Sequence, residues 1–196
     1  LLEKNSNSLF RVHELPAEDK IQALTAFLKL MGINLGVTEK LESRHYASVL
    51  KVAKDRKERR VIETMVLRSL KLAAYSEKNS GHFGLGLDSY THFTSPIRRY
   101  PDLMVHRAIK SGGATQDKKD VEELALQCSN FERRAELASR DVIAYLKCQY
   151  MRDKIGEEFS GLVTATTDFG LFVELADIFI EELVHVTTLP TGYYIY

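Results

Sequence analysis

The sequence predicts an α+β protein that is mostly helical. Apolar residues recur at helical spacing over much of residues 1–155, and at Gly156 the apolar period changes from about 3.6 to 2. The charge divides at the same point, with 27 basic and 20 acidic residues over 1–155 but no basic and seven acidic residues over 156–196. The formal net charge of zero is therefore the sum of two unlike segments, and we predict two domains, 1–155 and 156–196.

Three helices are predicted in the first third of the chain, after a short strand or loop at residues 9–12. Pro16 opens the first and Gly32 ends it, while Thr38 is the predicted N-cap of the second, and residues 58–75 form the third. The expected apolar faces are Ile21, Leu24, Leu28 and Met31 in the first; Leu41, Val49, Leu50 and Val52 in the second; and Ile62, Met65, Val66, Leu70 and Ala73 in the third.

Residues 76–95 break the helical pattern. Three glycines within residues 80–87 predict a short strand, or a loop where another group approaches the backbone closely. Ser95 followed by Pro96 then predicts the start of a helix that runs to about Lys110, because serine is favoured at the N-cap and proline at the first helical position.

A very long helix is predicted over residues 117–154, with a coiled coil as the alternative. Beyond Gly156, alternating apolar residues predict strands on both sides of a turn at 168–170 and a third strand at 180–186, too few to close a barrel. We expect the long helix to pack along most of its length through Val121, Leu124, Cys128, Phe131, Ala135, Ala138, Val142 and Leu146.

Composition excludes several classes of protein. The sequence has no run of about 18 apolar residues, so no transmembrane helix is expected. Its two cysteines, Cys128 and Cys148, cannot form a disulfide scaffold and lie too far apart in one helix to meet, which favours a cytoplasmic protein. The chain begins with Leu1 rather than Met and ends without a polar tail, so we expect a piece of a longer protein.

The predicted helix start at Ser95 gives the most specific indication of a binding site. Free backbone N–H groups and the helix dipole favour an anion there, and basic residues in the first turn oppose that dipole unless an anion is bound. Arg98 and Arg99 therefore indicate a phosphate contact, with ion pairs to acids such as Asp102 as the alternative.

Other candidate residues carry weaker patterns. His82 and His92 fit structural roles better than metal ligation, and no metal site is predicted. In the C-terminal segment, Phe169, Phe172 and His185 could form a stacking surface for bases. The alternative is that the two phenylalanines, at odd and even positions, point to opposite faces of a strand, so that at least one is core.

Taken together, these motifs resemble the ribonuclease II and ribonuclease R family of 3′-to-5′ exoribonucleases, with detail closer to ribonuclease R. The segment 159–189 resembles the first half of an OB-fold barrel of the ribosomal-protein-S-one type. The resemblance implies the C-terminal half of an RNB-type catalytic domain followed by an incomplete antiparallel OB-fold barrel. The matching strings are LFRVHELP (9–16), GHFGLGL (81–87), YTHFTSPIRRYPD (90–102), HRAI (106–109), ERRA (132–135), RDV (140–142), GLV (161–163), FGLFV (169–173) and LVHV (183–186).

The resemblance also implies a function. Members of this family degrade single-stranded RNA processively from its 3′ end to nucleoside 5′-monophosphates, using two magnesium ions held by clustered aspartates. Arg98 aligns with the family arginine beside the scissile phosphate, and Ser95, Arg99, His92 and Thr94 are expected to support or contact RNA. The aspartate cluster lies N-terminal to this segment in the family, so we expect the magnesium ligands in a missing N-terminal half and the chain alone to be inactive.

Two other functions remain open at this stage. The chain could belong to a non-catalytic RNA-binding or scaffold protein that retains only this part. It could also be a helical interaction module with no nucleic-acid role. Single-stranded RNA binding that weakens steeply with salt would count against the helical module.

Overall fold

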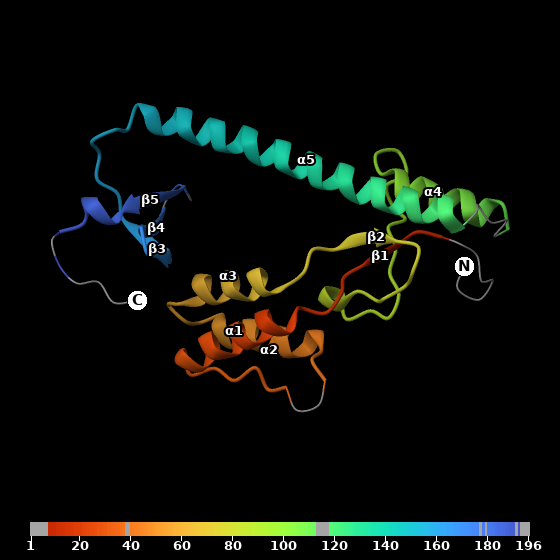
Figure 1. Cartoon of the computed structure of the whole chain (residues 1–196), viewed down its shortest axis with the longest axis horizontal. Helices are drawn as coiled ribbons and strands as arrows, with labels where there is room; N and C mark the ends of the chain where they lie inside the picture. Colours follow the sequence, from red (N-terminus) through yellow and green to blue (C-terminus); the bar gives the residue numbers. More distant parts are fainter. Residues whose placement is uncertain are drawn as a thin grey trace. The chain divides into compact units, whose positions relative to one another are not determined.

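The computed structural model describes residues 8–37, 40–112, 118–176, 178, 180–190 and 192. The chain forms two compact units, residues 1–135 and 136–196, and the long helix α5 (Lys118–Arg152) contributes to both. This division describes packing and does not test the domain boundary predicted at Gly156. The predicted class is confirmed: helices predominate, and the strands form two small antiparallel sheets (Figure 1).

Three helices build the first hydrophobic core. They are α1 (Glu18–Leu30), α2 (Ser43–Ala53) and α3 (Arg59–Ser69) (Figure 1). Each turns a narrow apolar stripe inward, which is the usual way in which amphipathic helices bury a face. The fully buried members of this core include Leu24, Leu28, Tyr46, Val49, Ala53, Ile62 and Val66.

The second helix differs from its prediction. It begins after Glu42, whose carboxylate and the His45 side chain form a reciprocal cap, while Thr38 lies outside the described residues. Tyr46, Val49 and Ala53 form its buried stripe at helical spacing. The prediction that Leu50 and Val52 belong to the core is wrong: their exposed fractions are 38% and 52%.

The third helix is shorter than predicted. It ends at Ser69, and residues Ala74–Ser76 form strand β2. Strand β2 pairs antiparallel with β1 (Phe10–Val12), so a partner far away in sequence decides its conformation. Local periodicity could not reveal this pairing.

The segment 81–90, which contains the glycines, hydrogen-bonds to the other edge of β1. The N–H groups of Arg11 and His13 donate to the carbonyls of Tyr90 and Gly81, at 2.9 and 3.0 Å. The predicted close approach occurs at Gly84, where a Cβ would lie 2.7 Å from Nδ1 of His13. Within this segment, Phe83–Leu85 form a short 3-10 helix, η1, rather than a strand.

A second core lies behind this small sheet. It joins Leu9 and Tyr75 to Met104 of α4 (Tyr100–Lys110) and to Val121 and Ala125 of α5. Helix α4 begins four residues later than predicted: Arg99 is its N-cap, and Ser95 lies in the preceding turn. Pro101 explains the difference, since proline is tolerated in the first helical turn but breaks a helix that has already begun.

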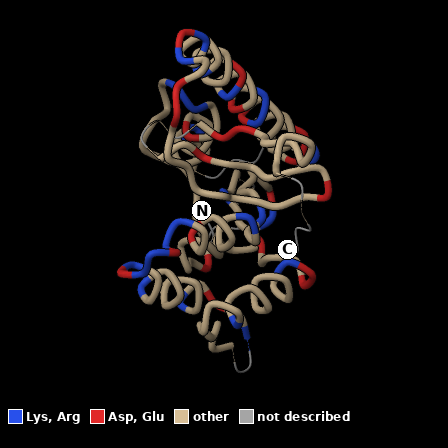
Figure 2. Tube along the Cα trace, turned by 90° about the vertical axis from the view of Figure 1, so that its left-hand side faces the viewer, with Lys and Arg blue, Asp and Glu red and all other residues tan. Residues whose placement is uncertain are grey.

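Helix α5 runs as one element, but only its beginning is packed. Val121 and Ala125 are buried, whereas Phe131, Val142 and Leu146 are 55–62% exposed. The expectation of packing along most of its length is therefore wrong. A 35-residue helix spans about 50 Å, more than the second core can cover. Basic and acidic residues are interspersed along its exposed part (Figure 2).

The second unit contains an open antiparallel sheet in the order β3-β4-β5, with β3 (Gly161–Thr167), β4 (Gly170–Leu175) and β5 (Glu181–His185). The 3-10 helix η2 (Val186–Thr188) follows β5. The predicted turn connects β3 to β4, and a Cβ at Gly170 would lie only 2.3 Å from the Val184 carbonyl oxygen. Three strands with open edges agree with the predicted incomplete barrel.

No helix among the described residues is both long and apolar enough to cross a membrane.

The corrected face of α2 can be tested with a matched pair of valines. We expect Val49→Ala to lower the free energy of unfolding by about 2 kcal/mol, because it removes two methyl groups from a fully buried site. The control Val52→Ala, on the exposed side of the same helix, should leave stability within about 0.5 kcal/mol. Denaturant unfolding of both variants measures the difference, and equal losses would contradict the assigned face.

Candidate nucleic-acid interface

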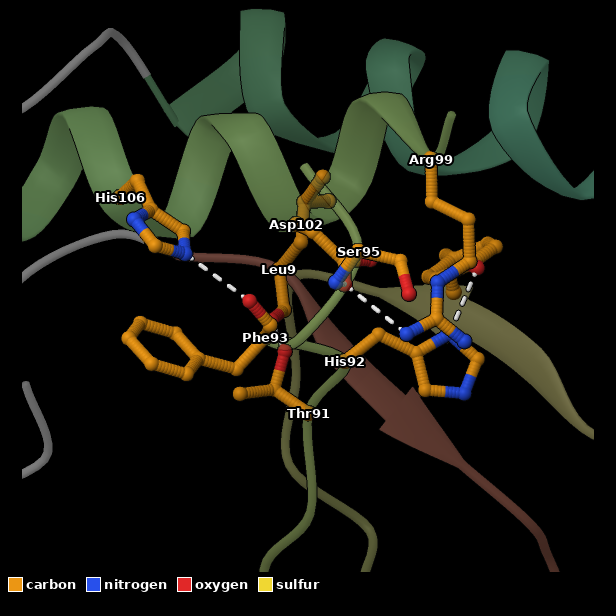
Figure 3. Close-up of polar contacts among 9 residues, drawn as sticks. Leu9, Thr91, His92, Phe93, Ser95, Arg99, Asp102 and His106 are labelled. Carbon is orange, nitrogen blue, oxygen red and sulfur yellow. Dashed lines mark hydrogen bonds and ion pairs between the residues drawn. The ribbon is translucent and has the colours of Figure 1, made fainter. Parts of the chain in front are cut away.

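A buried carboxylate organises the segment that the sequence singled out. Asp102, in the first turn of α4, is 0% exposed. One of its oxygens, Oδ2, accepts hydrogen bonds from the Ser95 backbone N–H at 2.7 Å and from the Arg99 guanidinium at 2.9 Å (Figure 3). These contacts tie the turn at residues 95–99 to the helix that follows it.

The partners of Asp102 keep it ionised. Burial by itself raises the pKa of this carboxyl, but the Ser95 N–H and the Arg99 guanidinium outweigh burial, so the pKa lies below its ordinary value. Oδ1 of Asp102 and Nε of Arg99 are buried without a hydrogen-bond partner among the described residues. The acid pairing anticipated as an alternative is thus present for Arg99.

Arg98 lies differently from its neighbour. Its side chain is exposed and makes no ion pair or hydrogen bond with the described residues. Both arginines precede α4 instead of lying in its first turn, so the helix-dipole argument for a bound anion does not apply here. Arg98 therefore presents a guanidinium that has no partner among the described residues, on a turn that Asp102 holds in place, a geometry suited to a phosphate.

His92 serves as a packing partner. Its Nδ1 lies 2.9 Å from the Tyr75 hydroxyl, and its ring meets Tyr75 and Tyr90 edge to face. Burial, and then the charges of Arg99 and Arg11, lower the pKa of His92. Burial, and then the nearby charge of Glu132, raise the pKa of Tyr75 to about 12. Both rings are therefore neutral at pH 7.

The cluster continues toward the glycine-rich segment. The His82 ring packs against Tyr90 on one side and His13 on the other, with ring centroids 5.2 and 5.1 Å apart. At the other end, the Arg11 guanidinium lies 4.7 Å from the Tyr75 ring centroid and pairs with Glu132 of α5 at 2.5 Å. This row of rings, with Arg11 and Glu132, connects β1, β2, the 82–92 segment and α5.

The remaining predicted residues of this segment are at the surface. Thr94 is exposed and Ser95 half-buried. Phe93, which was not singled out from the sequence, is 46% exposed and stacks on His106 of α4. In Figure 3 these two rings lie on the opposite side of Ser95 and Asp102 from Arg99 and His92. An aromatic residue inside a motif gives no indication of its exposure, so only the structure could identify it.

The three candidates of the second unit meet at one end of its sheet. The Phe169 and Phe172 rings are 6.3 Å apart, edge to face, which contradicts the alternative that they point to opposite faces of a strand. Phe169 lies in the turn before β4, where strand alternation does not apply. His185, opposite Gly170 in the register, uses Nδ1 to accept a hydrogen bond from the Thr187 N–H at 3.3 Å. Phe169 remains 49% exposed.

The described residues do not fit a magnesium site. They contain no group of three or more His, Cys, Asp or Glu side chains that could hold a metal ion. Asp102, the one fully buried carboxylate in the part of the chain that the structure describes, already faces Arg99 and the Ser95 N–H.

Comparison with known proteins decides the family. Residues 1–112 match the RNB domain. The chain belongs to the RNB family. Ribonuclease R of Escherichia coli K12 is 44% identical over 202 residues, an alignment that covers 95% of this chain and 25% of the relative. The chain thus spans about a quarter of the length of the curated RNB relatives it matches.

Solved structures of similar fold also match this chain. Mycoplasma genitalium RNase R in complex with ribose-methylated single-stranded RNA matches with a TM-score of 0.91 and 30% identity, covering 100% of this chain and 32% of that one. Yeast Ssd1, described as a pseudonuclease, matches with a TM-score of 0.79 and 23% identity, covering 94% of this chain and 24% of that one. The likeness to Ssd1 shows the shared fold alone.

The role of Asp102 leads to a stability prediction. Asp102→Asn should lower the free energy of unfolding by about 3 kcal/mol at pH 7, because it leaves the Arg99 charge without its buried partner. The pKa of this carboxyl is lower in the folded chain than the unfolded value of about 3.9. The stabilisation is therefore complete above pH about 4 and lost as the pH falls through the folded pKa.

Denaturant unfolding of both proteins at several pH values measures this effect. The gap between the wild type and Asp102→Asn should narrow below pH about 4. Asp55→Asn, at an exposed turn, is the control and should change little. A gap that stays constant from pH 7 to below 3 would show that the Asp102 charge is not responsible.

Proposed function

We propose that this chain is part of a 3′-to-5′ exoribonuclease that hydrolyses single-stranded RNA to nucleoside 5′-monophosphates. The observation that carries the proposal is the exposed Arg98, which has no side-chain partner among the described residues, on a turn held by buried Asp102 in a chain of the RNB family. The RNA bound in the Mycoplasma genitalium relative supports single-stranded RNA as the substrate class.

Arg98 acts through charge in this proposal. Its guanidinium donates to the non-bridging oxygens of a backbone phosphate near the scissile bond and stabilises the negative charge that builds there. The buried Asp102 contacts and the ring cluster fix the turn in advance, so little reorganisation is needed when RNA arrives. Ser95, Thr94, Arg99 and His92 line or support this turn.

Magnesium enters the proposal from outside this chain. Two-metal hydrolysis needs several carboxylate ligands, and the described residues do not offer them. We assign the ligands to segments that the longer RNB relatives have and this chain does not include. The exposed Phe169 and nearby Phe172 of the second unit provide a separate stacking surface for RNA. Cytoplasmic RNA degradation is the proposed setting.

A non-catalytic RNA-binding protein is the second candidate function. The fold alone does not establish catalysis, and a neighbour of the same fold is described as a pseudonuclease. In that case, Arg98 would hold RNA without assisting its hydrolysis.

The two candidates differ in what Arg98→Ala does to the full-length protein. For the nuclease, turnover should fall by about 10²-fold or more while RNA affinity changes by less than about fivefold, because the charge that Arg98 stabilises is greatest in the transition state. Single-turnover RNA hydrolysis and equilibrium binding measure the two quantities. Arg68→Ala, an exposed arginine on α3, is the matched control and should change neither. Equal losses in turnover and affinity would mean that Arg98 only holds the substrate.

The isolated 196-residue chain should show no magnesium-dependent exonuclease activity, because its described residues lack the ligands that two-metal hydrolysis requires. Release of mononucleotides from labelled single-stranded RNA is the measurement. A parallel preparation of Arg98→Ala controls for contaminating nucleases. Activity that is present in the wild type and lost in the variant would contradict this prediction.

A further inference from the structure

The side chain of Phe93 is unusual among the residues around Arg98. It is 46% exposed, yet its ring is held in place: it stacks almost parallel on His106, with centroids 4.2 Å apart and an interplanar angle of 5°. Nε2 of His106 also lies 2.8 Å from the Phe93 carbonyl oxygen, so the same imidazole contacts both the ring and the backbone of this residue (Figure 3).

This arrangement leaves an aromatic face available. His106 covers one face of the phenyl ring, so the exposed part is the opposite face and its edge. A ring with fixed side-chain torsions pays little conformational entropy when a flat partner stacks on it. Nucleobases are such partners, and stacking on aromatic side chains tolerates any base.

The charges of the segment that carries Phe93 favour RNA over a protein partner. Residues 89–112 contain a single acidic residue, Asp102, and it is fully buried. Three basic residues of the same range, Arg98, Arg107 and Lys110, are exposed. A polyanion with flat bases matches this combination of cations and an exposed ring.

We propose that the Phe93–His106 stack is a base-binding platform, on which one base of single-stranded RNA stacks while Arg98 holds a neighbouring phosphate. This inference rests on the proposed function and deepens it by assigning a positioning residue that the sequence did not reveal. Phe93 takes no part in the chemistry. It fixes the register of the strand relative to Arg98.

The test is equilibrium binding of a labelled oligoadenylate of about ten nucleotides to the 196-residue chain, by fluorescence anisotropy. Phe93→Ala should weaken binding about tenfold, and Phe93→Leu, which keeps an apolar side chain but no ring, should weaken it equally. Phe93→Trp should bind like the wild type. Phe131→Ala, an exposed phenylalanine on α5, is the matched control and should have no effect.

A second set of probes separates stacking from a structural effect. Oligoadenylates that each lack one base should include one that binds the wild type about tenfold more weakly, and that penalty should disappear in Phe93→Leu. A penalty that persists in the variant would overturn the platform. Thermal unfolding confirms that Phe93→Leu is folded.

The remaining outcomes distinguish the two proposals. If the wild-type chain binds the oligoadenylate and neither Phe93→Ala nor Phe93→Leu weakens that binding, the platform is wrong and the proposed function stands. If the wild-type chain binds no single-stranded RNA in low salt, the proposed RNA-binding role of Arg98 fails and the platform fails with it.

Discussion

The buried contact between Asp102 and the turn before α4 is the constraint on which the candidate interface depends. An ionised carboxylate that is 0% exposed requires charged or N–H partners, and it finds them in Arg99 and the Ser95 backbone. Of the two neighbouring arginines, Arg99 is therefore held in an ion pair. The other, Arg98, is left on the surface of a turn that can no longer move freely.

The aromatic cluster that includes His92 is built from parts far apart in the sequence. The rings of His13, His82, Tyr90, His92 and Tyr75 follow one another edge to face, with centroid separations of 5.1–5.7 Å. Burial lowers the pKa of each of the three histidines, so the cluster packs without buried positive charge at pH 7. Arg11 joins the cluster to α5 through Glu132.

Much of the fold could be predicted because local rules decide it. The apolar spacing of Leu24 and Leu28 places α1 against the core, and the change of period at Gly156 marks the sheet correctly. The predictions fail where contacts with a distant part of the chain determine the local structure. Strand β2 ends α3 early because β1 pairs with it, and Phe131 and Val142 are exposed because α5 extends beyond its packing partners. The sequence did contain the signal for the late start of α4, because Pro101 is tolerated only in the first turn of a helix.

The sequence by itself determined the family and the position of the central motif, since residue order and the HFTSPIRRY string are local properties of the chain. It also indicated that Arg98, Arg99 and Asp102 belong to one site, but it did not determine which arginine pairs with the carboxylate. Only the tertiary structure decided that Arg99 takes the carboxylate, Arg98 faces solvent, and Phe93 stacks on His106. The physical reason is that exposure and ion pairing depend on which surfaces meet after folding, and adjacent residues of one motif meet different surroundings.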